Sequence, residues 1–175
     1  MADNKKFLQV SVLNNSSYIL QPHEPSTVTV QGKLVSKPDE VKPGHRRSGG
    51  IWQAEVIPFH LPPHSGVGPV EFPGVQALSL YQFKEAPGVV LVILVEETFT
   101  QTAKVAFVRA DEVKFDKQYL ETLESAASVH SDTTYLFHIH GHPFAVEAKV
   151  QFLPTTKTLE HSTVQVTFSN AFTIE

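Results

Sequence analysis

Three closely spaced histidines are the residues of this chain whose types and spacing best suit chemistry. They form the segment His138-Ile-His140-Gly-His142, and Glu147 follows in the same stretch. In a β-strand, alternate side chains share a face, so His138 and His140 would point the same way. Such an imidazole pair can chelate a divalent transition metal when a neighbour supplies a third ligand. The candidate metal ligands are therefore His138, His140, His142 and Glu147, and the alternative is that the histidines are polar residues on the wet face of a half-buried strand.

The spacing of these residues is similar to a known metal motif. The pattern His140-x-His142-x4-Glu147 resembles the first metal motif of cupins, although the glycines that flank that motif are absent. The resemblance implies a metal-binding or metal-dependent protein. His161 is the only histidine after this motif, and it lacks the Pro and Gly context of the second cupin motif.

A second group of candidate residues lies in and beside loops rich in Pro and Gly. His45, Arg46 and Arg47 could bind an anionic group such as phosphate, sulfate or carboxylate. Trp52, the only Trp, could stack on a sugar ring or a lipid headgroup. The ligand-binding candidates are His45, Arg46, Arg47, Trp52, His60 and His64. The alternatives are solvated loop charges, core packing for Trp52 and a surface turn around His60 and His64.

Composition and charge exclude several other functions. The chain has 175 residues and no Cys, which excludes disulfides and thiolate chemistry. The formal net charge of −4 argues against a nucleic-acid partner. The first residues lack the apolar core of a signal peptide, and the run Val89–Val95 is too short to cross a bilayer. We expect a soluble protein that is cytoplasmic or non-classically secreted.

The sequence offers no catalytic motif that we recognise. It contains no Gly-rich phosphate loop and no nucleophile elbow. The adjacent acids Glu96 and Glu97 would lie on opposite faces of a strand, so they could not act together on one glycosidic bond. We therefore expect a protein that is not an enzyme and needs no cofactor, with the candidate metal as the one exception.

Alternating apolar and polar residues predict nine or ten β-strands. The strand Val89–Val95 is apolar on both faces and should lie at the centre of the fold. One helix is predicted over about residues 111–129, with Asp111 as its N-cap. Residues 37–50, with two Pro and three Gly, should form a loop. The predicted fold is a two-sheet antiparallel β-sandwich with the helix packed on it, one domain covering residues 1–175, and a small β-barrel is the alternative.

The order of these elements is similar to a family of membrane-active β proteins. The segments that carry the likeness are Val10-Ser-Val-Leu-Asn-Asn-Ser-Ser-Tyr18, residues 32–44, the strand at Val89–Val95 and the helix with Tyr119. They resemble the actinoporin-like cytolysins, the aegerolysins and the fungal fruit-body lectins. The chain departs from actinoporins because only six residues precede the first predicted strand, and because it has one Trp and four Tyr.

This resemblance implies a β-sandwich that recognises a lipid headgroup or a glycan. We expect the binding residues to lie in the loops Lys42–Gly50 and Pro58–Gly68, at one end of the sandwich. The toxin-like form of this hypothesis is membrane damage by one component of a larger assembly. It would require a homo-oligomer or a second protein component, because the amphipathic N-terminus of actinoporins is missing.

Overall fold

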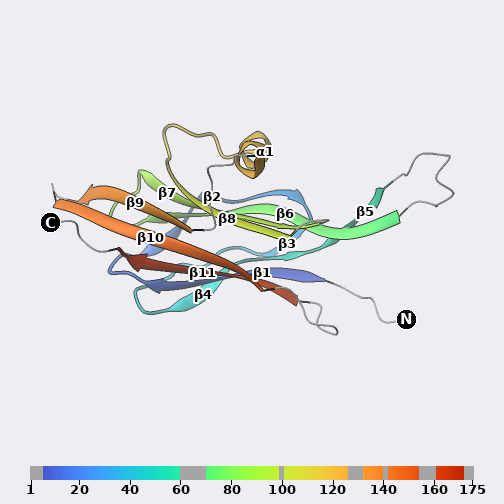
Figure 1. Cartoon of the computed structure of the whole chain (residues 1–175), viewed down its shortest axis with the longest axis horizontal. Helices are drawn as coiled ribbons and strands as arrows, with labels where there is room; N and C mark the ends of the chain where they lie inside the picture. Colours follow the sequence, from blue (N-terminus) through green and yellow to red (C-terminus); the bar gives the residue numbers. More distant parts are fainter. Residues whose placement is uncertain are drawn as a thin grey trace.

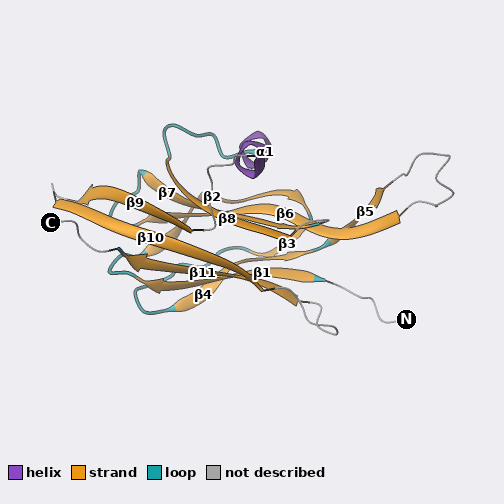
Figure 2. Cartoon of the chain, viewed as in Figure 1, coloured by secondary structure: helices purple, strands orange, loops and turns teal. Residues whose placement is uncertain are grey.

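The chain folds into two β-sheets and one short helix. The computed structural model describes residues 6–59, 70–98, 101–125, 132–139, 142–153 and 161–171. The elements are β1 (Phe7–Asn15), β2 (Leu20–Gln31), β3 (Lys33–Ser36), β4 (Arg46–Gln53), β5 (Glu55–Phe59), β6 (Val70–Phe83), β7 (Val89–Glu97), β8 (Gln101–Arg109), α1 (Lys117–Ser125), β9 (Asp132–Ile139), β10 (His142–Leu153) and β11 (His161–Asn170). Figure 1 shows the two layers with α1 outside them, and Figure 2 shows how strand dominates the fold.

The strands divide between a six-stranded sheet, sheet A, and a smaller sheet, sheet B. Sheet A has the order β3-β4-β1-β11-β10-β9, and sheet B has the order β2-β6-β7-β8, with β5 paired to β6. The predicted two-sheet sandwich is confirmed, and the described strands pair as two separate sheets with no closed ring among them. One pair differs from the expected antiparallel pattern, because β1 and β11 run parallel from Phe7↔His161 to Asn15↔Ser169. A parallel pair needs a long connection in the chain. Here the connection is nearly the whole sequence, because β2 to β10 all come between β1 and β11 in chain order.

The central strands of sheet B, β6 and β7, are buried on both faces. The inner face of the sheet meets sheet A in a core that draws on β1, β4, β6, β7, β10 and β11. Its outer face forms a second apolar cluster with Leu120 and Leu123 of α1. Every residue from Val89 to Val95 is buried, which confirms the predicted central strand. None of the helices in the described ranges is both long and apolar enough to cross a membrane.

The helix begins later than its sequence predicts. Asp116, not Asp111, caps it, because the Asp116 Oδ1 accepts a hydrogen bond of 2.9 Å from the backbone N–H of Tyr119. Asp111 lies instead in a turn in which the Glu112 N–H donates to the carbonyl of Arg109. The helix is described from Lys117 to Ser125, and residues 126–129 of the prediction fall outside the described ranges.

The predicted loop over residues 37–50 is wrong in its second half, where β4 begins at Arg46. Gly49 and Gly50 lie together opposite Val10 and form a β-bulge between the pairs Gln9↔Ile51 and Ser11↔Ser48. Gly50 has φ +119, and a Cβ there would lie 2.6 Å from Cη2 of the Trp52 ring. The two glycines therefore allow the strand to pass over a buried indole.

We predict that Gly50→Ala destabilises the protein by about 2–4 kcal/mol, because it combines a strained φ with a clash against Trp52. Urea unfolding followed by circular dichroism measures this change. Gly44→Ala is the matched control, since Gly44 also has a positive φ but has no atom near its Cβ position. The control should lose only about 1 kcal/mol. Equal losses in the two variants would show that the Trp52 contact does not matter.

Candidate functional site

Four chain segments meet at one end of the sandwich, which we call the loop end. They are residues 14–20, 41–46, 84–89 and 109–111, seen at the left of Figure 1. Backbone hydrogen bonds join neighbouring segments: Gly44 N to Asn14 O at 2.7 Å, Lys84 N to Ile19 O at 2.9 Å, and Ala110 N to Gly88 O at 2.9 Å. Backbone hydrogen bonds thus connect all four segments of the loop end to one another in series.

A buried asparagine holds two of these segments together. The Asn14 Nδ2 donates to the carbonyls of Tyr18, at 2.7 Å, and Val41, at 2.9 Å. Its Oδ1 accepts from the backbone N–H and the hydroxyl of Ser16. Asn14 is fully buried, so these bonds satisfy groups that water does not reach. The side chain fixes the β1–β2 turn against the segment that leads into β4.

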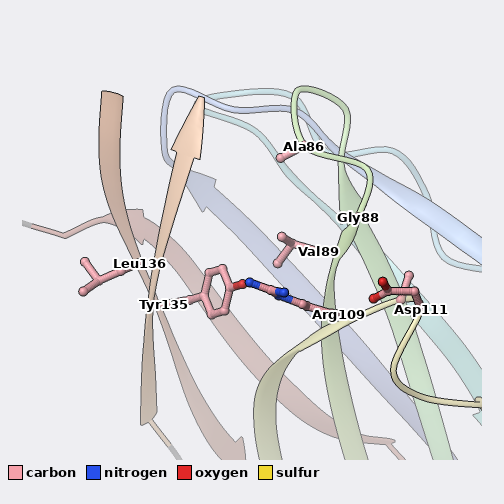
Figure 3. A pocket seen from close by; sticks show the side chains of 8 residues that line it. Ala86, Gly88, Val89, Arg109, Asp111, Tyr135 and Leu136 are labelled. Carbon is pink, nitrogen blue, oxygen red and sulfur yellow. The ribbon is translucent and has the colours of Figure 1, made fainter. Parts of the chain in front are cut away.

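The loop end contains a pocket of about 570 Å³, within the size range of small-ligand sites. It lies between the edges of the two sheets (Figure 3). Its lining residues are Ala86, Gly88, Val89, Arg109, Ala110, Asp111, Tyr135 and Leu136. The first three come from the connection into β7, the next three from the end of β8 and its turn, and the last two from β9. Small and apolar residues form much of the wall, and three polar side chains give the pocket its chemistry.

An arginine and a tyrosine from different sheets face each other in this pocket. Figure 3 shows the Tyr135 hydroxyl directed at the guanidinium of Arg109, with Asp111 on the other side of the arginine. A hydrogen bond with Tyr135, followed by the charge of Glu112, raises the pKa of Arg109. The Tyr135 ring packs on Phe107, with ring centroids 5.5 Å apart, and this contact orients the hydroxyl. Arg109 is 65% exposed, so its guanidinium can reach a ligand in the pocket.

Leu136 forms an apolar rim beside these polar groups. It is 61% exposed, and it is one of two large hydrophobic side chains with high exposure among the described residues. In Figure 3 it points away from Tyr135. The pocket therefore offers a cation, a carboxylate and a hydroxyl, and Leu136 belongs to its wall with a side chain that points away from these groups.

The predicted basic residues also lie at the loop end. His45, Arg46 and Arg47 are all exposed. The Arg47 Nη2 lies 3.4 Å from the His45 Nδ1, and the Arg46 Nη1 donates to the Ser11 hydroxyl at 3.0 Å. In the described part of the chain, no carboxylate forms an ion pair with either arginine. These side chains can meet an anion, but they form an open surface and do not line the pocket.

Trp52 does not form part of a binding surface, and that prediction is wrong. Its exposure is 0%, and its indole N–H donates to the Thr29 hydroxyl at 3.0 Å. Both features belong to a core side chain whose polar atom is satisfied. The ring packs beneath the Gly49–Gly50 bulge and therefore cannot stack on a sugar or a headgroup.

The two loops expected to form one site begin at opposite ends of the sandwich. β4 starts at Arg46 in the loop end, and β5 continues from it to Phe59 at the far end of the molecule (Figure 1). An extended chain of this length carries Phe59 far from His45. His60 and His64 themselves fall outside the described residues.

The histidine cluster is only partly described. His138 lies in β9 and pairs with Pro143, while His142 lies in β10 and pairs with Ile139. The side chains of these two histidines, and the whole of His140, are outside what the structure describes. Glu147 is half-buried in β10, opposite Thr134 and Ser169. Among the described side chains, no three potential ligands of His, Cys, Asp or Glu type form a metal site. The metal hypothesis stays a prediction.

Sequence reasoning missed the pocket residues Arg109 and Tyr135. They lie at the two ends of the segment that contains the helix, and no motif spacing joins them. The available signal was limited to the strand patterns before and after the helix: Arg109 directly follows the pattern at residues 103–108, and Tyr135 begins the pattern at residues 135–140. The sequence does not show that these two strands are edges of different sheets that meet.

Comparison with known proteins does not assign the chain to a family. Neither the protein-family models nor the curated proteins include a match to this sequence. The resemblance to actinoporin-like cytolysins and fruit-body lectins therefore stays a prediction.

We predict that Asn14→Ala destabilises the protein by about 3 kcal/mol, because it removes one donor from each of the carbonyls of Tyr18 and Val41 and leaves the buried Ser16 N–H without its acceptor. The midpoint of chemical unfolding measures the effect. The neighbouring Asn15 is exposed, so Asn15→Ala is the control and should change stability by less than about 0.5 kcal/mol. A loss of the same size in both variants would contradict a special role for Asn14.

Proposed function

We propose that this protein is a non-enzymatic binding module that recognises an oxyanion-bearing group, on a lipid headgroup or a glycan, at its loop end. The observation that carries this proposal is the pocket in which Arg109 and Tyr135 face each other. An arginine is the side chain best suited to a phosphate, sulfate or carboxylate, because its N–H groups donate in a planar fork. The tyrosine hydroxyl adds a second polar contact beside it.

The Asp111 carboxylate limits the kinds of ligand that would fit the pocket. It lies beside Arg109 and its charge contributes to the arginine's raised pKa. A ligand that brings only negative charge would meet repulsion from this carboxylate. A ligand that places an oxyanion on Arg109 and a hydroxyl or ammonium group on Asp111 would satisfy both. Acidic sugars and zwitterionic lipid headgroups share that arrangement.

The position of the pocket supports binding through loops. Its walls come from the ends of strands and their connections, which a bonded backbone holds in place. The exposed residues His45, Arg46 and Arg47 belong to the same end and would favour approach to an anionic surface. In its toxin-like form, the proposal adds an oligomer or a second protein component that would act on the membrane.

Two arms of one experiment distinguish the sources of the ligand. In the first, the protein is mixed with phosphatidylcholine vesicles or with vesicles that contain phosphatidylserine, and flotation measures the bound fraction. In the second, the same protein is applied to an array of neutral, sialylated and sulfated glycans. Binding in one arm assigns the source, and absence of binding in both arms, at tens of micromolar protein, overturns the proposal.

We predict that Arg109→Gln lowers affinity for the ligand found in this way by about tenfold or more, because it removes the charged donor from the pocket. Tyr135→Phe should lower affinity less, since it removes one neutral hydroxyl. Isothermal titration with the free headgroup or the monosaccharide measures both changes.

Arg46→Gln is the matched control for this titration. It removes the same charge from the same end of the molecule but lies outside the pocket. We expect it to leave affinity for the small ligand unchanged. If Arg46→Gln and Arg109→Gln weaken binding equally, the pocket is not the site and general attraction to positive charge explains the binding.

A further inference from the structure

Two carboxyl groups meet where α1 rests on sheet B. Glu96, near the end of β7, is only 7% exposed, and Glu124 lies in the last turn of α1. The two side chains form a hydrogen bond with each other. The Glu124 carboxyl also accepts from the Gln76 amide, and Glu96 accepts from the Thr98 hydroxyl at 3.0 Å. The pair is the polar part of the contact between helix and sheet.

A hydrogen bond between two carboxyl groups requires a proton on one of them. Two ionised carboxylates in contact repel each other, and burial makes the repulsion stronger. Burial, and then the hydrogen bond and charge of Glu96, raise the pKa of Glu124 to about 7, although Lys104 and Gln76 act in the opposite direction. The bond between the two acids is therefore made at mildly acidic pH and broken at mildly alkaline pH.

The rest of the helix contact is small. α1 has nine residues, too few for a stable helix in water without tertiary contacts. Its apolar side chains Leu120 and Leu123 cover the outer face of sheet B, and Phe115 and Tyr119 pack beside them. Near its end, the Lys104 ammonium donates to the Glu124 carbonyl at 2.8 Å. α1 has few other contacts with the sheet, so electrostatic repulsion between Glu96 and Glu124 can weaken its docking.

We propose that α1 is a proton-controlled cover of sheet B, docked while Glu124 carries a proton beside Glu96 and released when Glu124 is ionised. Release would uncover apolar residues of sheet B that the docked helix buries. This inference is independent of the ligand pocket, which lies at the loop end and shares none of these residues.

The neighbouring elements contribute few other charges. β8 supplies the cation Lys104, β6 supplies the uncharged Gln76, and β2 supplies the apolar Val28 and Val30. On the helix itself, Glu121 is exposed. His23 of β2 packs edge-on against the ring of Phe115, ahead of the helix. The Nδ1 of His23 is buried without a hydrogen-bond partner among the described residues.

The sign of the pH effect follows from the direction of the shift. The docked pKa of Glu124 lies above its ordinary value of 4.5. Its contribution to docking is therefore complete below about pH 4.5, falls as the pH rises, and is lost above about pH 7. Acid favours the docked helix and alkali favours release.

The absence of native cysteines gives a direct test, because an introduced thiol is the only one in the chain. In Leu123→Cys the thiol lies under the docked helix, and its labelling rate reports release. The labelling rate at each pH is divided by the rate of a free model thiol at the same pH. This ratio removes the pH dependence of the labelling reaction itself. From pH 5.5 to pH 8.5, we expect the corrected rate to rise by about tenfold or more.

Two further substitutions in the Leu123→Cys background decide the cause. Glu124→Gln keeps the hydrogen bonds without the ionisable proton, so its corrected rate should not change with pH. Glu121→Gln removes the same charge from the exposed side of α1 and should keep the full pH dependence. Glu96→Gln replaces Glu124→Gln as the test if that variant does not fold. A flat profile in the parent, or an unchanged profile in Glu124→Gln and Glu96→Gln, overturns the proposal.

Discussion

Burial of both faces of β7 is the constraint on which the rest of this structure depends. Seven consecutive apolar residues, Val89–Val95, leave no face of the strand that water could cover favourably. Sheet A covers one face, and α1 covers part of the other. The arrangement of two layers and an outer helix follows from this need. The same need explains the role of the short helix α1. Its side chains pack on Leu78, Leu80 and Leu94, which would be exposed to water without it.

The general fold could be predicted because it depends on patterns within short stretches of chain. Alternation marks the strands, and the apolar run marks the centre of sheet B. The helix start was misplaced because Asp111 and Asp116 are both plausible caps, and only the packing of Leu120 and Leu123 selects the second. The glycines at 49 and 50 were interpreted as loop residues. Their role in a bulge depends on the position of the Trp52 ring, which no local pattern reveals.

The candidate site could be predicted less well, for the same reason. His45, Arg46 and Arg47 were recognised because charged residues next to Gly and Pro are conspicuous in sequence, and they are exposed as surface charges should be. Trp52 was misjudged because residue type alone does not distinguish an anchor in the core from one at the surface. Arg109 and Tyr135 come together only because the edges of sheet A and sheet B meet at Phe107. That meeting is a property of the sandwich as a whole.

The parallel pairing of β1 with β11 has a consequence for how the molecule forms. β1 is synthesised before every other described strand, yet one of its two neighbours in sheet A, β11, is made only after β10. Until then, β4 is its only partner, and its other edge stays open. A topology with such distant contacts has a high contact order and folds slowly. During synthesis, the open edge of β1 is therefore the place where a nascent chain would need protection from other strands.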